Sequence, residues 1–319
     1  MIGDLISIVI PIFNEEGNLV ELIDRTLKAC QTTDYAFEVI LVDDGSSDDS
    51  ASIIGEATAT NREVIGVFLN RNYGQHAAVF AGFEQSQGHV VITIDGDLQN
   101  PPEEIPRLID EIEKGYDVVG TFRKIRNDSL FRRTASAMVN RAVRHVTGVM
   151  MSDYGCMLRA YRKPVVKAML ECHEHSTFIP ILANSFARNT TEIEVSHDER
   201  RSGDSKYGVF KLIALQFDLL TSMSTFPLKI LSIIGAAMAI AGFAFAIILL
   251  VARILLGSAW AADGIFTLFV PLFFFVGAQF MGLGILGEYI GRIYNDVRSR
   301  PRFFVQEVKT FESATSLSK

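Results

Sequence analysis

Two long apolar stretches in the last third of the 319-residue chain constrain its fold most. The first runs from about Leu228 to Leu250 and the second from about Phe266 to Ile290. Each contains roughly the 20 apolar residues that a helix needs to cross a bilayer. Their length and near absence of charge argue against buried core helices. The sequence therefore predicts two transmembrane helices.

Charges around the two stretches predict which side of the membrane each end faces. The short connector between them contains Arg253, Trp260 and Asp263. The outer flanks are rich in basic residues: Lys206, Lys211, Lys229, Arg292, Arg298, Arg300 and Arg302. Cytoplasmic loops carry an excess of Lys and Arg, so we expect a periplasmic connector and cytoplasmic outer parts. No basic and apolar leader precedes Leu5, and no cleaved signal peptide is predicted.

The first part of the chain, up to about residue 125, alternates between two patterns. Short runs rich in β-branched residues lie at Ile6–Ile12, Glu38–Asp43, Val64–Leu69, Val90–Asp95 and Asp117–Thr121. Helix-like stretches lie between them at Glu15–Cys30, Asp48–Ala59, Gln75–Ser86 and Pro102–Lys114. Strands that alternate with helices indicate an α/β fold with a mostly parallel sheet.

Two further segments have the pattern of helices that lie on a membrane surface. Residues 129–147 combine an apolar stripe with a basic side, and 206–226 are apolar around most of a helix. A solvated face of an ordinary domain helix is the alternative for 129–147. The predicted plan is a cytoplasmic domain over 1–205, an interfacial helix over 206–226, two spans over 227–291 and a cytoplasmic tail over 292–319.

Composition excludes several classes of function. A net charge of −7 argues against a nucleic-acid partner, which needs a basic surface. The three cysteines, Cys30, Cys156 and Cys172, form no CxxC pair, as expected in a reducing compartment. The chain has no GxGxxG after its first strand and no GxxxxGK[ST], which disfavours a Rossmann dehydrogenase and excludes a P-loop NTPase.

Acidic residues follow three of the predicted strands: Glu15, Asp43, Asp44, Asp95 and Asp97. The carboxyl ends of parallel strands meet at one edge of a sheet, so we expect these side chains to converge there. Their mutual repulsion calls for a cation. Asp95 and Asp97 form an Asp-x-Asp pair, and two such carboxylates suit Mg²⁺ or Mn²⁺ holding a diphosphate.

The segments PIFNEE, VDDGSSDDS and DGDLQNPPEE resemble the GT-A fold glycosyltransferases of family 2. More narrowly, the chain resembles the polyprenyl-phosphate glycosyltransferases, the group that includes dolichol-phosphate mannose synthase. The resemblance extends over essentially the whole chain. It implies a GT-A (Rossmann-like) domain followed by interfacial and transmembrane helices, a UDP-sugar donor, a Mn²⁺ or Mg²⁺ cofactor and undecaprenyl phosphate as acceptor, in a bacterial inner membrane.

Longer segments, among them LNRNYGQHAAVFAGF and GEYIGRIYNDVRSRPRFFVQ, are similar to one branch of that group. Its members pass 4-deoxy-4-formamido-L-arabinose from UDP to undecaprenyl phosphate, for modification of lipid A and polymyxin resistance. The implied reaction is a single displacement that inverts the anomeric carbon. A different hexosyl donor, such as a glucose or mannose nucleotide, remains open.

The resemblance also implies roles for single residues. Donor-binding candidates are Pro11, Asn14, Glu15, Asp43, Asp44, Asp95, Gln99 and His76, and the metal candidates are Asp95 and Asp97. Candidates for the acceptor phosphate are Arg200, Ser205 and Lys206, which match the family's loop over the donor and acceptor phosphates. Arg123 and Arg133 are further candidates that do not come from the resemblance. The catalytic candidates are Asp97, Asp153 and Arg200. The family usually has DAD where this chain has DGD, and both carboxylates are kept.

Several alternatives stay open. Asp153 is either a catalytic base or a structural acid, and His76 either contacts the sugar or only begins a helix. Gly287-x-x-x-Gly291 predicts a homo-oligomer, although packing of the two spans explains it equally well. A processive polysaccharide synthase is disfavoured because Trp260, the single tryptophan, lies in the connector and forms no QxxRW motif. A non-catalytic membrane scaffold is disfavoured by the intact carboxylates.

Overall fold

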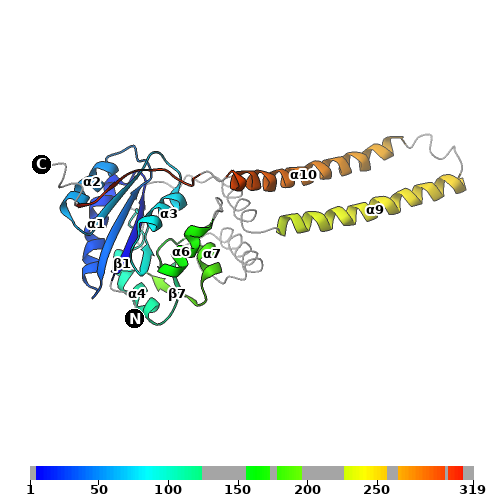
Figure 1. Cartoon of the computed structure of the whole chain (residues 1–319). Coiled ribbons are helices and arrows are strands. Elements are labelled where there is room, and N and C mark those ends of the chain that lie inside the picture. Colours follow the sequence, from blue (N-terminus) through cyan, green and yellow to red (C-terminus); the bar gives the residue numbers. More distant parts are fainter. Residues whose placement is uncertain are drawn as a thin grey trace. The chain divides into compact units, whose positions relative to one another are not determined.

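The computed structural model describes residues 5–123, 156–172, 178–195, 226–256, 265–298 and 301–311 (Figure 1). The chain divides into two compact units. The first contains Met1–Tyr207 together with Arg300–Lys319, and the second contains Gly208–Ser299. The sequence plan treated 292–319 as a separate tail, whereas the structure returns its later part to the first unit.

The first unit is built on a sheet that has eight strands within the described residues, in the order β7-β5-β6-β4-β1-β2-β3-β8. Four parallel neighbours form its centre: β4 (Val90–Thr93), β1 (Leu5–Ile12), β2 (Ala36–Asp43) and β3 (Val64–Leu69). β5 (Val118–Arg123) is parallel to β7 (Thr190–Val195). β6 (Arg159–Arg162) is antiparallel to both β4 and β5. The predicted α/β fold with a mostly parallel, Rossmann-like sheet is confirmed.

Helices cover both faces of this sheet (Figure 1). On one face lie α1 (Glu16–Gln31), α2 (Ser50–Thr60) and α4 (Ile105–Glu113), the last preceded by the 3₁₀ turn Pro102–Glu104. On the other lie α3 (Gln75–Gln85), α6 (Lys163–Glu171) and α7 (Ile179–Phe186). Strands buried on both faces read as continuous apolar runs, which is why β1 has the sequence LISIVIPI.

Close packing of α3 against the centre of the sheet depends on Gly82. A Cβ at this position would lie 2.3 Å from Val9 Cγ1 on β1, too near for any side chain. The glycine therefore lets α3 lie directly on β1 and places the start of α3 beside the ends of the central strands.

The C-terminal segment adds an edge strand that the sequence analysis did not predict. β8 (Val305–Lys309) is antiparallel to β3. Just before it, Asn70 N donates to Phe304 O at 3.3 Å. Arg302 donates to Cys172 O, and its guanidinium carbon lies 4.2 Å from the centre of the Phe80 ring. Residues 301–311 are therefore part of the folded first unit.

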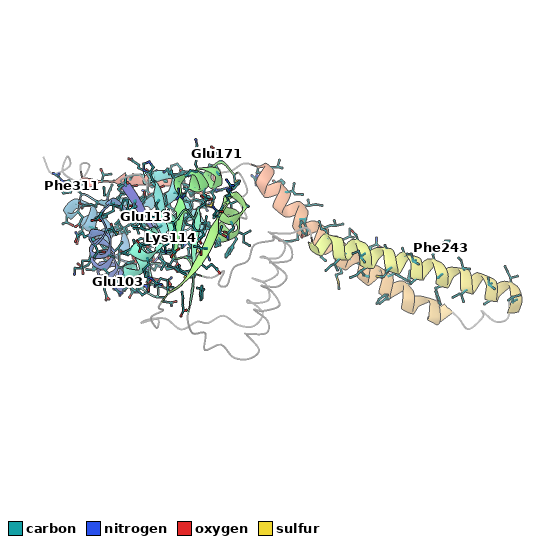
Figure 2. The ribbon with its side chains drawn as sticks, turned by 90° about the horizontal axis from the view of Figure 1, so that it is seen from below. Glu103, Glu113, Lys114, Glu171, Phe243 and Phe311 are labelled. Atoms are coloured by element: carbon teal, nitrogen blue, oxygen red, sulfur yellow. The ribbon has the colours of Figure 1, made fainter. Side chains whose placement is uncertain are left out.

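The second unit consists, in its described residues, of α9 (Phe226–Leu256) and α10 (Ile265–Val297). One segment of α10, Phe274–Gly291, is long and apolar enough to cross a membrane, and α9 contains a shorter apolar run. Phe243, which projects from α9, is 72% exposed (Figure 2). The second predicted span thus meets the length and apolarity needed to cross a membrane, and the first span stays a prediction. Residues 129–147 and 206–225, predicted as interfacial helices, lie outside the described part of the chain.

Candidate active site

A cavity of about 400 Å³ opens where the central parallel strands end. Six of the predicted site residues line it: Pro11, Glu15, Asp44, Asp95, Asp97 and Gln99. The expected convergence of acids therefore holds for four of the five carboxylates, Asp43 being the one that does not reach the cavity. A concave site of this volume with several polar groups is typical of a small-molecule pocket.

Asn14 and Asp43, two further predicted donor ligands, are used inside the loops. Asn14 has a left-handed backbone with φ of 55°, and its Oδ1 accepts hydrogen bonds from Ser47 N at 2.8 Å and Ser47 Oγ at 3.2 Å. Asn14 N donates to Ser46 Oγ at 3.0 Å. Buried Asp43 accepts from Ser46 N at 3.1 Å. The Asn14 side chain thus joins the loop after β1 to the loop after β2, whereas the Asp43 side chain bonds within the loop after β2.

The same two loops are joined a second time at the start of α1. Glu16 N donates to Asp48 Oδ2 at 3.1 Å, and Asp49 N donates back to Glu16 Oε2 at 2.9 Å. Glu15 N donates to Ser50 Oγ at 3.0 Å. The first backbone N–H groups of a helix have no partner within the helix, and side-chain oxygens from the other loop satisfy them here. The segments PIFNEE and DDGSSDDS thus fix each other's shape.

Asp44 holds the loop that follows β3. Its two carboxylate oxygens accept hydrogen bonds from Tyr73 N and Gly74 N, both at 2.8 Å. Burial raises the pKa of Asp44, and the two backbone donors oppose that rise. Gly45 beside it has φ of +68°, and a Cβ there would lie 2.5 Å from the carbonyl carbon of Arg71. The two loops therefore approach as closely as backbones can.

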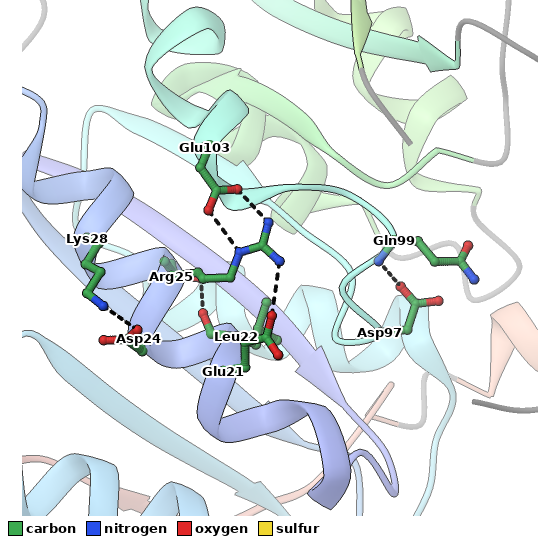
Figure 3. Close-up of polar contacts among 9 residues, drawn as sticks. Glu21, Leu22, Asp24, Arg25, Lys28, Asp97, Gln99 and Glu103 are labelled. Carbon is green, nitrogen blue, oxygen red and sulfur yellow. Dashed lines mark hydrogen bonds and ion pairs between the residues drawn. The ribbon is translucent and has the colours of Figure 1, made fainter. Parts of the chain in front are cut away.

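Asp95 and Asp97 follow β4 and differ in their surroundings. Asp95 Oδ1 accepts from Gln75 Nε2 at 2.6 Å, and Asp95 Oδ2 accepts from Asn100 Nδ2 at 3.0 Å. Asp97 Oδ1 accepts from Gln99 N at 3.2 Å (Figure 3). Leu98, between Asp97 and Gln99 in the chain, is buried and has a left-handed φ of 58°. A non-glycine residue in this conformation is strained, and such residues are common at functional sites.

These carboxylates fit part of a divalent metal site. No group of three His, Cys, Asp or Glu residues in the described ranges could hold a metal by itself. However, Mg²⁺ is usually bound by one or two carboxylates together with substrate phosphates, and it seldom has an all-protein cage. Asp95 and Asp97, with the Gln99 amide beside them, supply that number of hard oxygen ligands on one wall of the cavity.

His76 lies in the first turn of α3 but does not line the cavity. Its ring meets Phe178 edge-on at 5.4 Å between centres. Burial lowers the pKa of His76, which favours the neutral ring. The two predicted alternatives for His76 were contact with the sugar and a helix start. Its described contacts are those of a residue at a helix start that packs against an aromatic ring.

Arg123 ends β5, where its backbone is paired with Val195 of β7. Asp153, Arg133, Arg200, Ser205 and Lys206 lie outside the described residues.

Sequence reasoning missed Asn72, Gln75 and Met157, which also line the cavity. Asn72 and Gln75 follow β3, so the rule that ligands bind at strand carboxyl ends would have found them had it been applied to that strand. Met157 precedes β6, an antiparallel strand brought in by a non-local pairing. No local signal in the sequence marks it.

Comparison with known proteins gives consistent matches. The family described as "Glycosyl transferase family 2" matches residues 7–170. The chain is 60% identical over 304 residues to the undecaprenyl-phosphate 4-deoxy-4-formamido-L-arabinose transferase of Proteus mirabilis (strain HI4320), covering 95% of this chain and 93% of that protein. The protein of the same name from Pectobacterium carotovorum subsp. carotovorum (strain PC1) is 59% identical over 321 residues, covering 100% and 98%. Among solved structures, glucosyl-3-phosphoglycerate synthase of Mycobacterium tuberculosis matches with a TM-score of 0.49 and 18% identity, covering 69% of this chain and 78% of that one.

Proposed function

The chain belongs to glycosyl transferase family 2 and, within it, to the undecaprenyl-phosphate 4-deoxy-4-formamido-L-arabinose transferases, and from this premise we propose that it transfers that sugar from UDP to undecaprenyl phosphate. The observation that carries the proposal is the match to relatives of that name along nearly the whole chain. The biological outcome is modification of lipid A and, with it, polymyxin resistance.

The donor nucleotide occupies the cavity at the strand ends. Pro11, Glu15 and Asp44 form the wall for the uridine, and Asp95 and Asp97 face the diphosphate, with Gln99 alongside. Asn14 and Asp43 support the donor indirectly, because their hydrogen bonds fix the loops that carry the lining residues.

Mg²⁺ or Mn²⁺ is the cofactor that the paired carboxylates suit. When bound, the ion offsets the negative charge that develops on the departing diphosphate. Asp95 and Asp97 line the cavity, and the bond from Gln99 N orients Asp97.

In the reaction, an oxygen of the lipid phosphate attacks the anomeric carbon from the face opposite UDP. The bond from that carbon to the UDP oxygen breaks, so UDP leaves and the configuration inverts. Arg123, Arg133, Arg200, Ser205 and Lys206 bind the acceptor phosphate, since guanidinium and ammonium groups are its natural partners. Asp153 acts either as a catalytic base or as an acid that orients the acceptor loop. The acceptor phosphate is already anionic at neutral pH, so the reaction does not require a strong base.

Membrane attachment brings this domain to the layer where the lipid phosphate resides. We place α9 and α10 across the bacterial inner membrane, with a short periplasmic loop between them and the first unit in the cytoplasm. Residues 129–147 and 206–226 lie along the membrane surface.

The glycines of α10 support a homo-oligomer as part of this proposal. Gly282 packs against Leu231 of α9, where a Cβ would lie 3.4 Å from Leu231 Cδ1. At Gly287 and Gly291 a Cβ would meet no described atom within 4 Å. These two glycines are therefore not needed for the packing of α9 on α10, which leaves them for a helix of a second copy.

A donor comparison tests the proposed function. The purified full-length chain is incubated with undecaprenyl phosphate and, in separate reactions, UDP-4-deoxy-4-formamido-L-arabinose, its unformylated amine and UDP-glucose. We expect the formamido sugar to be transferred far faster than either alternative, because a site group that bonds the formyl oxygen stays unpaired with the amine. Equal transfer from UDP-glucose would reduce the assignment to the broader polyprenyl-phosphate group.

A further inference from the structure

We propose that Gln75 is a positioning residue for Asp95, and that its side-chain amide sets the carboxylate orientation in which a divalent cation and the donor diphosphate are bound. The inference rests on the proposed function. It concerns a residue to which neither the sequence motifs nor the family resemblance assigned a role.

The geometry at Asp95 points to this role. Gln75 Nε2 lies 2.6 Å from Asp95 Oδ1, and Asn100 Nδ2 lies 3.0 Å from Asp95 Oδ2. A carboxylate only accepts hydrogen bonds, so both amides must turn their NH₂ groups toward it. The two amides therefore hold the carboxylate from both of its oxygens.

Neutral donors suit a carboxylate that must also bind a cation. An Arg or Lys at the same place would orient Asp95 and would also cancel the charge that attracts the metal. An amide orients without cancelling. Each carboxylate oxygen has two lone-pair directions, so the hydrogen bond from Gln75 takes up only one of the two at Asp95 Oδ1.

The fold delivers Gln75 to this point through Asp44. Gln75 is the first residue of α3, and the two residues before it are held by the Asp44 carboxylate through Tyr73 N and Gly74 N. Gly74 has φ of +94°, a value that glycine adopts without strain and that turns the chain into the helix. Asp44, after β2, therefore fixes the loop that leads into Gln75. Gln75 in turn bonds Asp95, after β4.

The two amide donors differ in how deeply they are built into the core. Asn100 is 3% exposed, and its Oδ1 accepts from the Cys156 thiol at 3.4 Å, which in turn lies 2.9 Å from Thr121 Oγ1. Asn100 is thus part of a buried network. Gln75 is exposed and lines the cavity. Removing its amide should disturb Asp95 with little effect on the core.

Binding of Mn²⁺ to the full-length protein in detergent tests the proposal. Free Mn²⁺ is measured by electron paramagnetic resonance in the presence of saturating UDP, for the wild type and Gln75→Met. Methionine keeps the length and the helix preference and removes the donor. Gln85→Met, at the other end of α3, is the matched control, because Gln85 does not line the cavity.

We expect Gln75→Met to weaken Mn²⁺ binding about tenfold, the usual effect of losing a group that orients a metal ligand. The melting temperature should be unchanged, transfer should recover at high Mn²⁺, and Gln85→Met should match the wild type. Unchanged Mn²⁺ binding in Gln75→Met would overturn the inference, as would a lowered melting temperature, which would assign Gln75 a structural role. If the wild type itself bound no Mn²⁺ with UDP, the proposed metal site would fail instead.

Discussion

Arg25 on α1 donates two hydrogen bonds to Glu103 in the 3₁₀ turn, Nε to Oε1 at 2.9 Å and Nη2 to Oε2 at 2.8 Å (Figure 3). Two parallel hydrogen bonds between a guanidinium and a carboxylate form a stronger and more directional interaction than a single hydrogen bond. Glu103 follows the segment that begins with Asp95 and Asp97. The pair therefore ties the far end of the loop that carries Asp95 and Asp97 to α1.

Loss of the Arg25–Glu103 pair should lower the free energy of unfolding only slightly. The loss should appear at neutral pH and disappear in acid. Glu103 is half exposed, so we expect Arg25→Gln to cost below about 1 kcal/mol, and the melting temperature to fall by about 1–3 °C at neutral pH. The hydrogen bond from Arg25 holds the pKa of Glu103 below its usual value of 4.5. A lowered folded-state pKa gives stability that is present above the unfolded pKa and is lost as pH falls through the folded value.

Melting temperatures of wild type and Arg25→Gln across pH check this, with Lys28→Gln as the control. Lys28 pairs with Asp24 on the same helix, but both side chains are more than half exposed. The difference for Arg25→Gln should shrink below pH 4.5 and exceed that for Lys28→Gln at neutral pH. A difference that stayed constant with pH would exclude the pair as its source.

Asp97→Asn should abolish transfer and leave the fold intact. The substitution keeps the shape of the side chain and removes the charge that offsets a bound cation, so we expect the turnover rate to fall by at least about 100-fold. Asp97 is partly exposed and accepts only the bond from Gln99 N among the contacts described, so the melting temperature should not change. Near wild-type turnover in this variant would remove Asp97 from the metal site.

Two glycines of the site should differ sharply in their tolerance of alanine. At Gly45 a Cβ would lie 2.5 Å from a backbone atom of Arg71, and the φ of +68° is strained for any other residue. Gly45→Ala should therefore cost on the order of 1–3 kcal/mol and weaken UDP binding by moving the loop after β3.

Gly96→Ala is the matched comparison. Its Cβ would lie 3.0 Å from Ile12 Cδ1, the end of a side chain, and 3.1 Å from Pro11 O. Shifts of a few tenths of an ångström relieve such contacts, so stability should change by less than about 1 kcal/mol. Melting temperature and UDP affinity measure both variants. Equal damage at the two positions would contradict the close approach of the loops after β2 and β3.

Much of the first unit follows from local sequence pattern, because its central strands are buried runs separated by amphipathic helices. Strands β1 to β5 lie where the β-branched runs predicted them, with small differences at their ends. β6, β7 and β8 were not predicted. Each is short and pairs with a strand far away in the chain, and such pairings leave no local period to detect.

The site was predictable to a similar extent. Acids at strand ends converge because parallel strands share an edge. Asn14 was assigned to the donor by its motif, yet its side chain bonds Ser47 in another loop, a relationship that depends on how two loops meet. Gln75 escaped notice because glutamine after a strand has no characteristic chemistry until its partner, Asp95, is known.

Membrane topology is tested with reporters at two places. A reporter at Trp260 should read periplasmic, and one at the C-terminal Lys319 should read cytoplasmic, as the basic flanks predict. Fusion at the end is preferable to fusion after Arg302, because β8 begins at Val305 and an insertion there would interrupt the sheet. The reverse pattern would place the first unit on the periplasmic side.

Product analysis tests the central claim most directly. The purified full-length chain is incubated with UDP-4-deoxy-4-formamido-L-arabinose, undecaprenyl phosphate and Mn²⁺, and the lipid fraction is analysed by mass spectrometry. We predict undecaprenyl phosphate carrying one formamido-arabinose, with UDP released, and no such product with EDTA or with Asp97→Asn. Absence of the glycosylated lipid from the wild-type reaction, or its undiminished formation by Asp97→Asn, would contradict the account.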